Sequence, residues 1–263
     1  VTITANFSEA LISSPTFSIT GIATNVLMTA TNSPTQWIYT WDVASSYEKE
    51  VTATASATDL AGNHYTGNQS ITFKIDNTAP TVALTDNDSN DIVRNSDVVT
   101  ITANFSEALI STPTFSITGI VTNVLMTATN SATQWNFTWN VSSTNDGQVL
   151  ADVSGKDLAG NEYNGNDSIS IIIDNTKNTV NLSSNDTDNI IKNGAEIILN
   201  AIFSESLITT PTLSISGFDS IVEMIPSNTT NSWTYTWDVS TTLAGEIIAS
   251  VNGIDLAGNT LSS

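Results

Sequence analysis

VTITANFSEALIS, at Val1–Ser13, is the stretch that decides the fold, because the chain repeats it. An identical copy lies at Val99–Ser111, and a diverged copy, IILNAIFSESLIT, lies at Ile197–Thr209. The three copies start at positions 1, 99 and 197, so the offset is 98 residues each time. This period is longer than the roughly 20–50 residues of a solenoid repeat and has the size of a whole domain. The sequence therefore predicts tandem modules, each with a core of its own.

Inside the repeat, apolar and polar residues alternate with a period of two, as they do in half-buried strands. Turn residues recur about every 8–12 positions, and no segment has the pattern of a long amphipathic helix. Seven short strands in one repeat are typical of an all-β, immunoglobulin-like Greek-key β-sandwich. For the middle module we expect strands at Thr81–Thr85, Val98–Phe105, Thr114–Thr118, Thr122–Ala128, Gln134–Val141, Val149–Ser154 and Ser168–Asp174.

Two turn-rich segments mark the module boundaries: DNTAPT at Asp76–Thr81 and DNTKNT at Asp174–Thr179. They predict modules at residues 1–78, 79–176 and 177–263, of which the first lacks its first strand and the third its last. The chain is therefore expected to be part of a longer array. Because Asn178 stands in the second linker where the first has Pro80, the second linker is expected to be less stiff.

Aromatic residues share one face of the strand predicted at Gln134–Val141, where Trp135, Phe137 and Trp139 have the same parity. Such a face either fills the core or stacks on sugars. Ile101 and Ala103, of matching parity on an earlier strand, favour the core. We expect at least one of the two tryptophans to be nearly fully buried.

The composition excludes several classes of function. The 26 acidic residues outnumber 6 basic ones, giving a formal net charge of −20, so nucleic acid and anionic membranes are poor partners. No apolar stretch approaches the length of a membrane helix. The absence of cysteine and the single histidine, His64, argue against zinc and nucleophile chemistry, so the chain is expected not to be an enzyme.

Three motifs recur in fixed order: Ser-Glu at the end of the second strand, as in Ser106–Glu107, DLAGN from Asp157, and the linker DNTAPT. Together they resemble the bacterial Ig-like repeats of large surface adhesins and biofilm-associated proteins. The resemblance covers the whole chain. It implies an extracellular stalk of rigid, often calcium-loaded modules that projects an adhesive tip.

An immunoglobulin topology brings two loops of each module to the end that faces the preceding linker. Asp76, Glu107 and Asp157 should therefore meet, and Asp174, Glu205 and Asp255 should form a second set. Crowded carboxylates repel one another unless a cation compensates them, and calcium accepts 6–8 oxygen ligands in flexible geometry. Backbone carbonyls with Asn77 or Asn161 could complete the shell. The alternative is that these acids are solvated turn residues.

A weaker second cation site is predicted in the loop DNDSND, through Asp86 and Asp88. It is not an EF-hand, because Asp91 occupies the position that requires glycine and no helices flank it. A solvated loop is the alternative there.

The pattern as a whole predicts a spacer or stalk segment of a secreted or cell-surface adhesin, stiffened by structural calcium at the module junctions, whose partners are neighbouring modules of the same chain. The sequence does not identify the receptor. The other hypotheses are ligand- or glycan-binding modules and an accessory array attached to a secreted enzyme.

Overall fold

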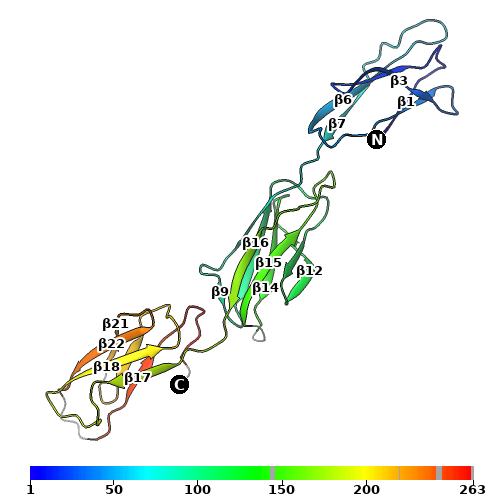
Figure 1. Ribbon diagram of the computed structural model, residues 1–263. Helices are drawn as coiled ribbons and strands as arrows, with labels where there is room; N and C mark the ends of the chain where they lie inside the picture. The colour runs from blue at the N-terminus through cyan, green and yellow to red at the C-terminus, as the bar shows by residue number, and fades with distance from the viewer. Residues whose placement is uncertain (143–145, 219, 241–244, 262–263) are drawn as a thin grey trace. The chain divides into compact units, whose positions relative to one another are not determined.

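The computed structural model describes residues 1–142, 146–218, 220–240 and 245–261, and the elements in these ranges are strands (Figure 1). In this part of the chain no helix is long and apolar enough to cross a membrane. Residue contacts divide the protein into two compact units. The first unit comprises Val1–Thr81, Ser106–Ser111 and Gly155–Asn164, and the second comprises Val82–Phe105, Thr112–Ser154 and Gly165–Ser263.

The predicted second module contains two sheets, as expected for a β-sandwich. The first has the order β13-β14-β10-β8, and the second has the order β12-β11-β15-β16-β9. All pairings are antiparallel except that of β9 with β16, which is parallel. The bounds are β8 Val82–Asp86, β9 Ile92–Val93, β10 Val98–Phe105, β11 Thr114–Ile117, β12 Val121–Leu125, β13 Thr127–Ala128, β14 Gln134–Asn140, β15 Gly147–Ser154 and β16 Ser168–Ile173.

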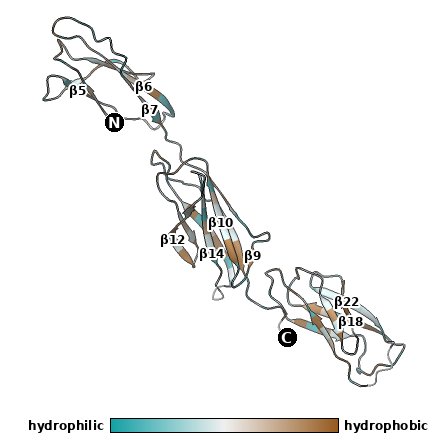
Figure 2. Ribbon diagram, turned by 180° about the vertical axis from the view of Figure 1, so that it is seen from behind, coloured by the Kyte–Doolittle hydropathy of each residue, from teal (hydrophilic) through white to brown (hydrophobic). Residues whose placement is uncertain are grey.

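The core of this module lies between the two sheets, where alternate residues of β10 are buried. Val99 stands opposite Trp139 and Ile101 opposite Phe137 in the pairing of β10 with β14. Trp139 is only 4% exposed, which confirms the prediction that at least one tryptophan is nearly fully buried. The ring of Phe137 lies 4.6 Å from that of Phe115 on the other sheet, so aromatic contacts join the layers. Figure 2 shows hydrophobic residues gathered on β9 and β10.

Two of the predicted strands in this module need correction. The strand expected at Thr122–Ala128 is divided into β12, which pairs with β11, and β13, which pairs with β14 in the other sheet. Met126 stands between them and is buried, so the chain crosses from one sheet to the other through the core. The first strand begins at Val82, and it is followed by β9, which the sequence pattern did not indicate because it spans two residues in a polar stretch.

The predicted third module, also in the second unit, follows the same plan. Its sheets have the orders β17-β18-β22-β21 and β20-β19-β23. Trp237 is buried on β22 and packs on Phe218, with ring centroids 5.4 Å apart. The bounds are β17 Val180–Ser184, β18 Glu196–Phe203, β19 Thr212–Ile215, β20 Ile221–Glu223, β21 Ile225–Pro226, β22 Ser232–Asp238 and β23 Ala249–Asn252.

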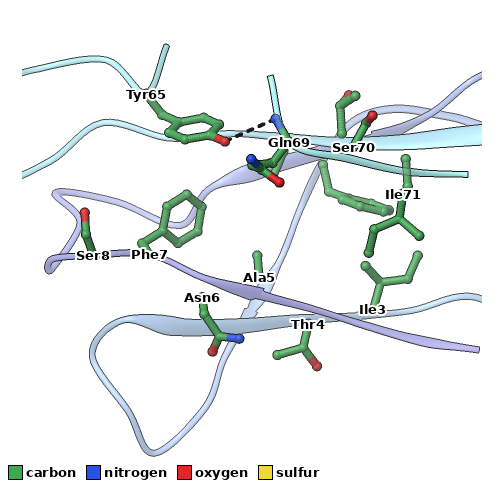
Figure 3. A pocket seen from close by; sticks show the side chains of 14 residues that line it. Ile3, Thr4, Ala5, Asn6, Phe7, Ser8, Tyr65, Gln69, Ser70 and Ile71 are labelled. Atoms are coloured by element: carbon green, nitrogen blue, oxygen red, sulfur yellow. Dashed lines mark hydrogen bonds between the residues drawn. The ribbon is translucent and has the colours of Figure 1, made fainter. Parts of the chain in front are cut away.

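The first unit contains the sheets β1-β5-β4 and β3-β2-β6-β7. A cavity of about 480 Å³ opens beside β1 and β7, where Ile3, Phe7, Tyr65 and Ile71 line it (Figure 3). β1 corresponds to β10 and β7 to β16, and in the second module β8 and β9 pair with those strands. The bounds are β1 Thr2–Asn6, β2 Thr16–Ile19, β3 Ala23–Leu27, β4 Thr29–Ala30, β5 Gln36–Thr40, β6 Lys49–Ser56 and β7 Ser70–Ile75.

Candidate metal centres

The first carboxylate cluster lies within the first unit and consists of Asp76, Glu107 and Asp157. Asp76 follows β7, whereas Glu107 and Asp157 lie in the loops after β10 and β15. One carboxylate oxygen of each residue lies within 4.8 Å of the other two. The structure thus brings together the three side chains that the topology predicted to meet. Cation binding by them stays a prediction.

Asp157 is fully buried and is held by the DLAGN loop that it begins. Its Oδ1 accepts a hydrogen bond of 2.8 Å from the amide of Asn161, and its Oδ2 accepts one of 2.7 Å from Nδ2 of the same residue. Gly160 has a φ of 94°, which favours glycine, and its amide donates to the carbonyl of Asp157. The motif therefore closes a tight loop around a buried carboxylate.

Asn161 also attaches the linker to this loop, because its Nδ2 donates to the carbonyls of Asp76 and Thr78, at 3.0 and 3.3 Å. Asn77 likewise acts as a donor, from its amide to Glu48 and from Nδ2 to the carbonyl of Tyr47. Either residue could complete a cation's shell, according to the sequence, and ligation by their side-chain oxygens stays a prediction. In the structure their Nδ2 groups donate hydrogen bonds that position the linker.

Lys74 is a member of this site that the sequence did not indicate. Its Nζ lies 2.8 Å from Oδ2 of Asp76, and this hydrogen bond holds the pKa of that carboxyl below its ordinary value. Burial raises the pKa of Glu107, and the charges of Asp76 and Asp157 raise it further. Recurrence could not find Lys74, because position 172, one repeat later, is isoleucine.

The second cluster lies within the second unit and consists of Asp174, Glu205 and Asp255, again with one oxygen of each within 4.8 Å of the others. Asp255 is fully buried, and its Oδ1 accepts a 2.7 Å hydrogen bond from the amide of Asn259. Asn259 Nδ2 donates to the carbonyl of Asp174 at 2.9 Å, which repeats the linker contact of the first cluster. Oδ2 of Asp255 is buried and has no hydrogen-bond partner in the protein.

The negative charges of the second cluster are less compensated than those of the first, where Lys74 pairs with Asp76. Burial, followed by the nearby charges of Asp174 and Asp255, raises the pKa of Glu205 to about 7. None of the ion pairs found among the described residues includes a member of this cluster. A buried carboxylate oxygen without a donor is costly, and a hard cation would satisfy it. The donor set therefore fits calcium, which oxygen ligands bind in flexible geometry.

The second linker differs from the first at Asn178, which is fully buried. Its Oδ1 accepts a hydrogen bond of 3.1 Å from Oγ of Ser204, while its Nδ2 is buried without an acceptor. Pro80, at the same position of the first linker, is buried too. Asn178 is thus packed into the protein, and the expected lower stiffness of its linker stays a prediction.

Asp86 and Asp88, the weaker predicted site, hold a turn. Oδ1 of Asp86 accepts from the amide of Asp88 at 2.8 Å, and Oδ1 of Asp88 accepts from the amide of Asn90 at 3.0 Å. In the described part of the chain neither joins a group of three clustered acidic side chains. Burial raises the pKa of Asp86. Its role in cation binding stays a prediction.

Solved structures with similar folds include tandem repeats from several proteins. A tetra-tandem repeat in the extending region of a large adhesion protein is 19% identical, with a TM-score of 0.37, and the match covers 99% of this chain and 68% of that one. Domains A168–A170 of titin are 13% identical, with a TM-score of 0.43 and coverages of 99% and 96%. Fibronectin(III)-like modules of Clostridium thermocellum CbhA are 14% identical, with a TM-score of 0.35 and coverages of 69% and 90%.

None of the curated proteins compared matches the chain. A family model does match it, over residues 35–124, a window that begins beside β5 and ends within β12. This window contains the linker DNTAPT and the Ser-Glu pair, two of the motifs on which the resemblance depends. The predicted resemblance is therefore confirmed: residues 35–124 match the bacterial Ig-like domain (group 3).

Proposed function

We propose that this chain is a spacer segment of a bacterial surface adhesin, in which calcium ions hold successive Ig-like modules at a fixed orientation. The observation that carries the proposal is the recurrence of a complete carboxylate cluster. Each cluster takes one aspartate from a linker and two acids from the loops that follow, and all three positions repeat after 98 residues. A near-exact repeat suits a spacer, because each module of a spacer has the same role of adding length.

Calcium would act here as a structural ion. One ion bound to Asp76, Glu107 and Asp157 would connect the end of β7 to the loops after β10 and β15. It would also neutralise carboxylates that otherwise repel one another. An extracellular location fits this role, and the net charge of −20 would keep a surface protein soluble.

The glycan-binding alternative needs aromatic side chains on the surface. Trp41, Trp139 and Trp237 are buried. Among the described residues, Tyr65 is the one exposed aromatic side chain. No observation therefore favours sugar stacking. An accessory array attached to a secreted enzyme remains a hypothesis that the full-length sequence would test.

The test compares the whole chain in calcium and in chelator. Calcium should raise the melting temperature, because an ion that binds only the folded state stabilises it by about 2.7 kcal/mol at 100 times its dissociation constant. Small-angle scattering should give a larger maximum dimension with calcium, because fixed linkers no longer bend. Equal dimensions and equal melting temperatures under both conditions would overturn the proposal.

Matched variants assign the response to each cluster. Glu107→Gln with Asp157→Asn should abolish calcium binding at the first cluster and leave the second intact. Glu205→Gln with Asp255→Asn should do the reverse. Glu196→Gln with Glu223→Gln serves as the control: it removes the same number of charges from exposed positions outside both clusters and should leave the stiffening unchanged.

A further inference from the structure

The two carboxylate clusters use the same three positions, yet their surroundings differ by one charge in direct contact. In the first cluster Lys74 Nζ lies 2.8 Å from Asp76 Oδ2. The corresponding residue beside the second cluster is Ile172, whose side chain is partly exposed and carries no charge. Residues two apart along an extended strand point to the same side. Ile172 therefore lies on the same side of its strand as Asp174, just as Lys74 lies on the same side as Asp76.

The second cluster also differs from the first in the hydrogen bonds of its buried aspartate. Oδ2 of Asp255 is buried without a donor, on a residue that is fully buried. At the equivalent position of the first cluster, both oxygens of Asp157 accept hydrogen bonds from Asn161. The second cluster therefore offers a cation a desolvated oxygen that no protein group occupies.

No lysine or arginine among the described residues forms an ion pair with the second cluster. Arg94 donates to the carbonyl of Gly258 and lies 4.0 Å from Asp97, and Lys177 is exposed on the linker. Neither forms an ion pair with Asp174, Glu205 or Asp255 in the described structure. At the first linker Glu48 accepts the amide of Asn77, and at the second Asp146 accepts the amide of Asn175 in the same way, so this additional acid is common to both.

We propose that Lys74 is a built-in competitor for calcium, so that the two clusters fill at different calcium concentrations. The second cluster binds first. The first cluster binds only when calcium displaces Lys74 from the carboxylate of Asp76. The inference rests on the proposed function, since it concerns the same two sites. It makes the stiffening graded, with one linker fixed at low calcium and both fixed at high calcium.

Electrostatics sets the expected size of the effect. A single positive charge about 6 Å from a divalent ion, screened by water, weakens binding by roughly tenfold. The flexible, exposed stem of Lys74 lets its ammonium group move aside, so binding at the first cluster is weakened and not abolished.

The experiment measures calcium binding by titration calorimetry on the full chain, with one cluster disabled at a time. In a background of Glu205→Gln with Asp255→Asn, Lys74→Gln should tighten binding at the first cluster by roughly tenfold. Lys74→Arg keeps the charge and is the matched control, so it should leave the affinity unchanged within a few-fold. In the opposite background, Glu107→Gln with Asp157→Asn, Ile172→Lys should weaken binding at the second cluster and Ile172→Gln should not.

The outcomes separate the two proposals. Equal affinities at both clusters, unmoved by Lys74→Gln, would overturn the competitor role and leave calcium stiffening standing. No calcium binding at either cluster in any background would overturn the proposed function, and the competitor role with it. Circular dichroism of each variant in chelator confirms that it is folded before its binding is compared.

Discussion

Asp157 and Asp255 occupy equivalent positions, but only Asp157 has hydrogen-bond partners on both carboxylate oxygens. The difference arises at the asparagine that closes each loop. Asn161 gives its Nδ2 to Asp157 and to the linker carbonyls, whereas Asn259 gives its Nδ2 to the linker carbonyls of Asp174 and Thr176. The same motif can thus leave all oxygens of its buried aspartate paired in one copy and one oxygen unpaired in another.

Glu205 provides a pH-dependent test of the second cluster in the absence of calcium. Its pKa in the folded protein is about 7, above the ordinary 4.5, so the folded state binds the proton more tightly than the unfolded state does. The stability that protonation contributes is fully present below about 4.5 and is lost as the pH rises through 7. In chelator, Glu205→Gln should therefore melt at a higher temperature than the wild type at pH 8 and at nearly the same temperature at pH 4.

Thermal unfolding of both proteins across this pH range, in the same chelator, is the measurement. Asp188→Asn, in an exposed loop, is a control that should show no such growing difference between pH 4 and pH 8. A Glu205→Gln curve that runs parallel to the wild-type curve throughout would contradict a raised pKa.

The candidate sites show what recurrence can and cannot reveal. Asp76, Glu107 and Asp157 were predictable because each repeats after 98 residues and because the topology places their loops at one end of a module. Lys74 was not predictable, because it occurs in one copy only. The donor roles of Asn77 and Asn161 depend on side-chain orientation, which spacing alone does not determine.

At the scale of elements, hydrogen bonds join the end of each linker to the serine that follows β10 or β18. The amide of Thr81 donates to Oγ of Ser106 and the amide of Ser106 donates to the carbonyl of Thr81. Thr179 and Ser204 repeat this pair of hydrogen bonds. The residue before the threonine differs between the two linkers: it is Pro80 in the first and Asn178 in the second.

This difference predicts unequal effects of the same substitution. Ser204→Ala removes the acceptor of Thr179 and the donor that satisfies the buried Oδ1 of Asn178, so it should cost about 1–3 kcal/mol of unfolding free energy. Ser106→Ala removes one exposed hydrogen bond and should cost about 1 kcal/mol or less. Denaturant unfolding in chelator measures the unfolding free energy of both variants. Equal losses would show that the hydrogen bond from Ser204 to Asn178 does not stabilise the protein.

Most strand positions followed from alternation. β10 has the predicted bounds, and β11, β14 and β16 differ from prediction by one residue at most. The sheet crossing at Met126 and the short strand β9 were missed for a physical reason. Each depends on which partner strand is near, and a two-residue segment has too little pattern to indicate a partner.

At the scale of the whole molecule, the described strands form six sheets, and each sheet takes its strands from one predicted module. The cores should therefore unfold separately. Trp139→Ala empties a site that is 4% exposed in the second module and should lower that module's unfolding free energy by about 3–5 kcal/mol. Scanning calorimetry should show one transition at lower temperature, with the others unmoved.

Leu125→Ala is the control in the same module, because Leu125 is 68% exposed and its truncation should change stability by less than about 0.5 kcal/mol. If Trp139→Ala shifted every transition together, the modules would share one cooperative core and the predicted boundaries at residues 78 and 176 would be wrong.

The parallel pairing of β9 with β16 has a consequence for a chain that is pulled. β9 lies near the start of the second module and β16 at its end, so tension applied through the termini draws these neighbours in opposite directions along their length. Their hydrogen bonds, from Ile172 to Asp91 and from Asp174 to Val93, are then sheared together and must break at once, which takes more force than unzipping them singly. Asp174 belongs also to the second carboxylate cluster. An ion held there would stand beside the hydrogen bonds that first resist rupture.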